Sequence, residues 1–139
     1  MSSRNGYYTL ITINHYNRML RPLGILEQEI MDILWKKKEG SVRDVFEELK
    51  NGKSIAYTTV LTVMNRLAAK GCLKRKADGN AFIYQPAQTQ DKFLSGIIKK
   101  FLTGLSKDFG KELVARQFAE GIESLDPKIA RELLKISKK

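Results

Sequence analysis

The sequence predicts a mainly α-helical protein in which three short helices and a β-hairpin precede a second helical region. Two changes in hydrophobic periodicity predict this order. Apolar residues recur at helical spacing up to residue 71, at strand spacing over residues 72–86, and at helical spacing again from residue 94. A third observation concerns the partner: a formal net charge of +10 indicates a polyanion, nucleic acid before a membrane surface.

The composition excludes several kinds of site. Cys72 is the only cysteine and His15 the only histidine, so an intrachain disulfide, a Cys-rich zinc site and a Ser-His-Asp triad are all excluded. The sequence has no phosphate-binding loop, nucleophile–base pair or paired-carboxylate motif. We therefore expect neither an enzyme nor a bound cofactor or metal. The longest apolar run near the N-terminus, Thr9 to Ile13, is too short to enter a membrane, which predicts a cytoplasmic protein.

Residues 1–21 show no sustained helical or strand period and are expected to form a flexible tail. The first helix follows over 25–37, where Leu26, Ile30, Ile33 and Leu34 trace one apolar face, and Gly40 is expected to stop it. Ser41 and Asp44 then have capping-box spacing at the start of a second helix, which the dipeptide Asn51-Gly52 closes.

The third helix is predicted over Ser54–Lys70, with Gly71 as its C-terminal cap. Its period then gives way to two alternating segments around the turn signal Asp78-Gly79, and Pro86 ends the second segment. Three helices followed by a hairpin are typical of the winged helix-turn-helix. Residues 22–87 are thus predicted to form a winged-helix DNA-binding domain.

The third helix is apolar on one face and rich in hydroxyl groups on the other, mostly near its N-terminus. In a helix-turn-helix the N-terminal part of the second helix enters the major groove, where short hydroxyl side chains allow close approach. Basic residues of the hairpin, the wing, are suited to phosphates or a minor groove. The predicted DNA-contacting residues are Ser54, Tyr57, Thr58, Thr59, Thr62, Asn65, Arg66, Lys70, Arg75, Lys76 and Asn80.

Residues 88–139 carry three further amphipathic segments, the last opened by Asp126 as N-cap and Pro127 at the first helical position. Three short helices do not bury three apolar faces among themselves, which favours a dimer interface over packing back onto the winged domain. The predicted interface residues are Leu94, Ile98, Phe101, Leu105, Val114, Phe118, Ile129 and Leu133.

The stretches "LGILEQEIMDILW", "AYTTVLTVMNRLAAKG" and "YQP" resemble the penicillinase-repressor family, the BlaI/MecI/CopY group of bacterial transcription repressors. The resemblance runs from about Leu23 to the C-terminus. It implies a homodimer that places one winged domain on each half of a palindromic double-stranded operator. It also implies that the C-terminal helices make the dimer, that Ser54–Lys70 is the recognition helix and that Lys74–Phe82 is the wing.

Two departures from the family pattern bear on how repression ends. Copper-responsive members carry cysteines near the C-terminus, whereas this chain ends in "LLKISKK", so metal sensing is not expected. Antibiotic-responsive members are inactivated by cleavage of an Asn-Phe bond, and the matching position here is Gln117-Phe118. The family pattern implies cleavage at this bond and a membrane sensor protease as a partner, but Gln replaces the Asn of that pattern, so release by cleavage and release by a ligand both stay open. The alternative function is a winged-helix module that binds proteins without specific DNA readout.

Overall fold

The computed structural model describes Arg18 and residues 21–137. The predicted flexible tail, residues 1–21, lies outside the described residues except at Arg18 and Arg21. The chain divides at Gly96 into two compact units, each treated separately below.

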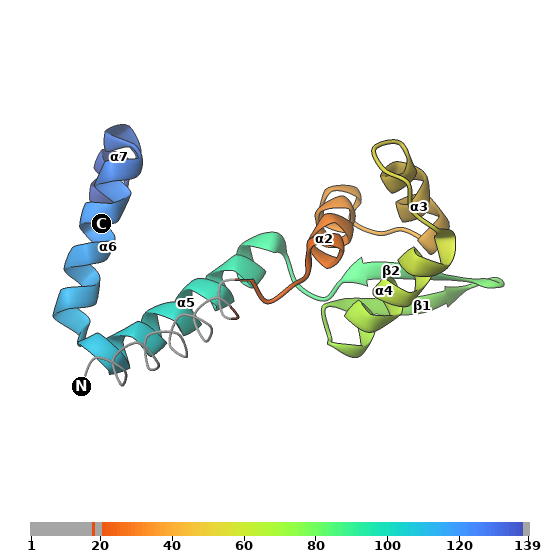
Figure 1. Ribbon diagram of the computed structural model, residues 1–139, viewed down its shortest axis with the longest axis horizontal. Helices are drawn as coiled ribbons and strands as arrows, with labels where there is room; N and C mark the ends of the chain where they lie inside the picture. The colour runs from red at the N-terminus through yellow and green to blue at the C-terminus, as the bar shows by residue number, and fades with distance from the viewer. Residues whose placement is uncertain (1–17, 19–20, 138–139) are drawn as a thin grey trace, which may run out of the picture. The chain divides into compact units, whose positions relative to one another are not determined.

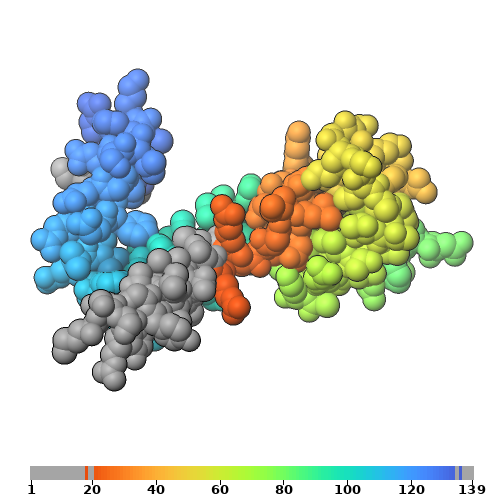
Figure 2. Space-filling view, in the orientation of Figure 1, coloured from red at the N-terminus to blue at the C-terminus, as the bar shows by residue number. Residues whose placement is uncertain are grey.

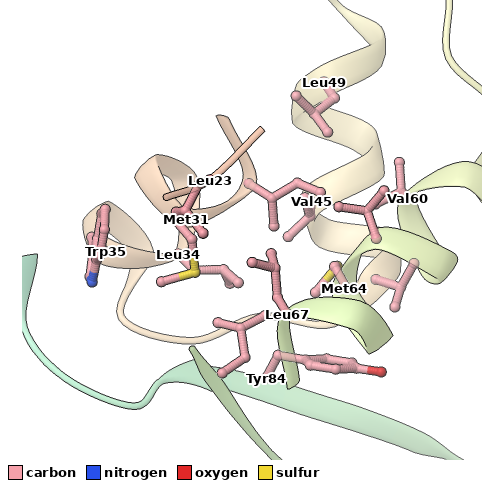
Figure 3. Close-up of a cluster of buried hydrophobic side chains, with 14 residues drawn as sticks. Leu23, Met31, Leu34, Trp35, Val45, Leu49, Val60, Met64, Leu67 and Tyr84 are labelled. Atoms are coloured by element: carbon pink, nitrogen blue, oxygen red, sulfur yellow. The ribbon is translucent and has the colours of Figure 1, made fainter. Parts of the chain in front are cut away.

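The first unit contains the three predicted helices, α2 (Ile25–Lys37), α3 (Val42–Lys50) and α4 (Tyr57–Ala69) (Figure 1). Their apolar faces meet in one core (Figure 3), which the hairpin residues Leu73 and Tyr84 complete. Ile30, Leu34, Val45, Val60, Met64 and Leu67 are fully buried in it. Burying a side chain of this size stabilises the fold by about 1.5–3 kcal/mol. The core therefore fixes the orientation of α4 in the domain.

The connection between α2 and α3 differs in one detail from the prediction. Helix α2 ends at Lys37, and Lys38, not Gly40, takes the positive φ of 80°. Gly40 instead pairs with the second strand: its N–H donates to Tyr84 O (3.0 Å) and its carbonyl accepts from Tyr84 N (2.8 Å). The predicted capping box is confirmed, since Ser41 Oγ accepts from Asp44 N and Asp44 Oδ2 accepts from Ser41 N.

Helix α4 begins three residues later than predicted. Ala56 is its N-cap, in an extended conformation, and Ser54 lies before the helix. The end agrees with the prediction, because Gly71 has φ 82°. Gly71 N donates to Ala68 O and Cys72 N to Leu67 O, the paired bonds of a Schellman motif.

The hairpin consists of β1 (Leu73–Asp78) and β2 (Ala81–Pro86), paired antiparallel with Arg75 opposite Tyr84 and Asp78 opposite Ala81. The two turn residues are therefore Gly79 and Asn80, one position beyond the expected Asp78-Gly79. Gly79 has φ 63°, which suits glycine at the first position of a type II′ turn. The tip of the hairpin, shown in green, projects beyond the three helices (Figure 2).

Helix α5 (Gln90–Phe109) starts in the first unit and continues into the second. Near its start, the Phe93 ring lies 5.2 Å from the Trp35 ring, and Trp35 Nε1 donates to Gln88 O at 3.0 Å. The predicted domain boundary at residues 87–88 comes before this contact.

The second unit contains the rest of α5 together with α6 (Lys111–Leu125) and α7 (Pro127–Ser137), so the three C-terminal helices are present as predicted. Gly110, with φ 90°, separates α5 from α6. The Oδ1 of Asp126 accepts from Lys128 N at 2.8 Å, as expected for an N-cap. Among the helices that the structure describes, none combines the length and apolar character needed to cross a membrane.

Candidate nucleic-acid interface

The exposed face of α4 carries the hydroxyl groups predicted from the sequence. Thr58, Thr59, Thr62, Asn65 and Arg66 are exposed, whereas Val60, Val63 and Met64 between them pack into the core. The hydroxyl of Thr62 donates to Thr58 O at 2.8 Å, a common bond for threonine within a helix. Thr62 therefore presents its methyl group and a lone pair, whereas Thr59 lies two helical turns before Arg66 on the same face.

The N-terminal end of α4 is braced against α3 through Tyr57. Its ring meets Phe46 edge-on at 5.6 Å, and the Arg43 guanidinium lies 5.1 Å above the ring centre. Tyr57 is 38% exposed, so it can still reach a ligand. Arg43 was not predicted as part of this surface, because only the packing of α3 on α4 brings it there.

The wing places its basic residues on two faces. Side chains alternate along a strand, so Arg75 shares the α4-facing side with Tyr84 and Phe82, while Lys74 and Lys76 lie on the other side. Arg75 stacks 4.7 Å over the Phe82 ring and donates to Asn65 Oδ1 at 3.2 Å. Lys76 Nζ lies 3.8 Å from Glu39. Asn80 is exposed in the turn at the tip.

Lys70, the C-cap of α4, is held by the protein itself. Its Nζ donates to both carboxylate oxygens of Glu27 (2.7 and 3.1 Å), and Gly24 N donates to the same carboxylate at 3.1 Å. Burial of Glu27 opposes its ionisation, but the hydrogen bonds from Lys70 and Gly24 outweigh it and keep the pKa of Glu27 below the ordinary value. The prediction that Lys70 contacts DNA thus competes with an ion pair that ties α4 to α2.

Leu61, which was not predicted as a contact residue, is 37% exposed on the hydroxyl-rich side of α4. The sequence signal for this exposure was its position, three residues after Thr58 and four before Asn65, because that position falls outside the apolar stripe of the helix. A solvent-facing leucine there can contact a thymine methyl group.

The predicted dimer residues lie along the C-terminal helices. Leu94, Ile98, Ile129 and Leu133 are exposed in the single chain, whereas Val114 is buried. Phe101 and Phe118 are half-buried and pack on each other within the chain, with ring centres 6.3 Å apart; Leu105 is half-buried as well. Between α6 and α7 lies an apolar hollow of about 570 Å³, lined by Ala119, Ile122, Ala130 and Leu133 among others.

The described residues contain no cluster of His, Cys, Asp or Glu that could hold a metal ion. Cys72 is half-buried beside Glu27 and Lys70, and burial raises the pKa of its thiol, which makes it a weak nucleophile.

A helix with an exposed hydroxyl-rich face beside a basic hairpin defines the chain as a winged-helix protein of the DNA-binding class. Comparison with known proteins narrows the class. The profile of the penicillinase repressor family matches residues 23–138, and the chain belongs to this family of transcriptional repressors, which are not enzymes.

Two relatives found by sequence similarity agree with this assignment. The chain is 34% identical over 104 residues to the transcriptional regulator BlaI of Mycobacterium tuberculosis, covering 74% of this chain and 75% of that one. It is 31% identical over 88 residues to the methicillin resistance regulatory protein MecI of Staphylococcus aureus, covering 63% and 72% of the two chains. A solved structure of Bacillus licheniformis BlaI, in monomeric form with the blaP half-operator, is 28% identical, with a TM-score of 0.44 over 50% of this chain and 84% of that one.

Proposed function

We propose that this repressor works as a homodimer that occupies a palindromic operator and blocks transcription, one winged domain on each half-site. The observation that carries the proposal is the exposed face of α4, with its threonines beside the basic wing. Family membership supports the regulatory role. DNA is in the cytoplasm of a bacterial cell, and we place the repressor there.

The proposed DNA contacts divide into two classes. Thr58 and Thr59 face the bases with hydroxyl and methyl groups, Thr62 faces them with its methyl group, and Leu61 adds an apolar contact. Residues suited to the phosphates are Ser54, Tyr57, Arg66, Arg75, Lys76 and Asn80. Lys70 belongs to the second class only if it leaves Glu27.

The proposed dimer is formed by the C-terminal helices. Leu94 and Ile98 of α5 and Ile129 and Leu133 of α7 each expose at least 41% of their surface. Exposed apolar side chains of this size on a regulatory domain are typical of a subunit interface. The apolar hollow between α6 and α7 supplies a place for side chains of the second copy.

We propose that release follows cleavage of the Gln117–Phe118 bond by a membrane sensor protease. The bond lies inside α6 (Lys111–Leu125), so it must unwind locally before a protease can bind it as an extended strand. Cleavage there would separate most of α6 and all of α7 from the DNA-binding unit. The two half-sites would then be bound independently, which loses the advantage of a high effective concentration.

A gel-shift titration tests the function directly. The full chain is titrated onto a duplex from its own upstream region and onto a scrambled duplex of the same length, at several salt concentrations. We expect tighter binding to the upstream duplex at every salt concentration. Equal affinity for both duplexes, or no binding at low salt, would favour the protein-interaction alternative instead.

A further inference from the structure

Asn65 is hydrogen-bonded to the wing through its side-chain oxygen. Its Oδ1 accepts from the Tyr84 hydroxyl at 2.7 Å and from Arg75 Nη1 at 3.2 Å. A guanidinium group only donates, which fixes the amide oxygen, not the nitrogen, as the atom that faces Arg75. Both lone pairs of this oxygen are therefore used within the protein.

Tyr84 is the fixed point of this arrangement. It is 1% exposed, and its backbone pairs with Gly40 through two hydrogen bonds. One residue thus joins the hairpin to the α2–α3 connection, to the core and, through its hydroxyl, to α4. Tyr84 itself is too deeply buried to contact a ligand.

Arg75 is held from a second side by Phe82, whose ring lies 4.7 Å from the guanidinium carbon. Phe82 is 47% exposed, so this stacked pair lies at the surface of the domain. An arginine has five N–H groups in a rigid fork. One N–H group is bonded to Asn65 and one face of the guanidinium stacks on Phe82. The remaining N–H groups are therefore already oriented, and binding a ligand costs no further side-chain freedom.

We propose that Asn65 and Tyr84 are positioning residues, which hold Arg75 of the wing in place to bind a DNA phosphate, and that Asn65 does not read a base. Bidentate recognition of adenine by asparagine needs the amide oxygen as acceptor and the nitrogen as donor, and here the oxygen is already occupied. This inference rests on the proposed function and specifies how the wing serves it.

The test uses the full-length chain and the two duplexes named above, upstream and scrambled. The variants are Tyr84→Phe, Asn65→Ala, Arg75→Ala and the double variant Tyr84→Phe/Arg75→Ala. We expect Tyr84→Phe and Asn65→Ala to weaken binding to both duplexes by the same factor, about three- to tenfold. The slope of log affinity against log salt should become shallower by about one unit, as for the loss of one phosphate contact. In Arg75→Ala, the further change Tyr84→Phe should have no additional effect.

Ser41→Ala is the matched control, because it also removes one hydrogen bond from the same domain but leaves the wing untouched. We expect it to lower the melting temperature without changing the salt slope. A wild-type slope in Tyr84→Phe, or an Asn65→Ala loss confined to the upstream duplex, would overturn this inference alone. If the wild-type chain binds neither duplex, the inference and the proposed function both fail.

Discussion

Replacing Glu27 by glutamine should loosen the C-terminal end of α4 from the N-terminus of α2. The Glu27 carboxylate accepts from Lys70 Nζ at 2.7 and 3.1 Å and from Gly24 N at 3.1 Å. Its side chain is 10% exposed and that of Lys70 43%. Glutamine keeps an acceptor for Gly24 but loses the charge that holds Lys70, so the variant isolates the ion pair.

The size of the stability loss expected for Glu27→Gln follows from this partial burial. A hydrogen bond to a charged group contributes about 1.5–3 kcal/mol when buried, and an exposed ion pair about 0–1 kcal/mol. With one buried and one half-exposed partner, we expect Glu27→Gln to lower the free energy of unfolding by about 1–2 kcal/mol. For a domain of this size that corresponds to a melting temperature lower by roughly 4–16 °C.

The effect should depend on pH in a definite direction. The pKa of Glu27 in the folded chain lies below its ordinary value of 4.5, because the hydrogen bonds from Lys70 and Gly24 outweigh the opposing effect of burial. Such a group stabilises the fold above its unfolded pKa, and this stability is lost as the pH falls through the folded pKa. The free energy of unfolding of the wild type should therefore exceed that of the variant by the full amount at pH 7, and by progressively less below pH 4.5.

Thermal unfolding followed by circular dichroism, at pH 7 and at steps down to pH 3, measures the stability difference and its dependence on pH. Glu29→Gln is the matched control, since Glu29 pairs with Lys53 at the surface and should change stability by less than about 0.5 kcal/mol. The reasoning is refuted if Glu27→Gln matches this control, or if its effect stays constant across the pH range.

Three further predictions concern other parts of the chain. Thr59→Ala should cost roughly 1–3 kcal/mol of discrimination between the upstream and scrambled duplexes in a gel shift. Thr62→Val should retain wild-type discrimination because the Thr62 hydroxyl bonds its own helix. A loss of discrimination in Thr62→Val but not in Thr59→Ala would contradict these roles. Lys38→Gly should raise the free energy of unfolding by up to about 1 kcal/mol in urea titrations, because glycine adopts the φ of 80° without steric cost; a clear loss of stability would contradict this. A fragment of residues 1–117 should bind the upstream duplex about a hundredfold more weakly than the full chain, and unchanged affinity would exclude cleavage at Gln117–Phe118 as the release step.

Local signals in the sequence predict most of the elements of the first unit. The apolar period of residues 25–37 gives α2 with both ends correct, and the spacing of Ser41 and Asp44 gives the start of α3. Gly71 marks the end of α4 because a positive φ there favours glycine. These features depend on residues within one turn of each other, so they can be predicted without the tertiary structure.

Features that depend on packing were not predictable. The predicted helix starts at Ser54, but the extended Ala56 delays the start of α4. Contacts of Asn65 with Arg75 and Tyr84 join positions 10 and 19 residues apart and exist only in the observed hairpin register. The burial of Glu27 against Lys70 was not predicted, because it depends on how α2 and α4 cross.

The central claim, that two joined winged domains bind one palindromic site, is tested most directly by comparing two duplexes. Footprinting of the upstream region first locates the protected site, and the full chain is then titrated onto the whole site and onto one half of it. Two chains per whole-site duplex, bound at least a hundredfold more tightly than the half-site, are the predicted result. Equal affinity for both duplexes with one chain bound to each would contradict the claim.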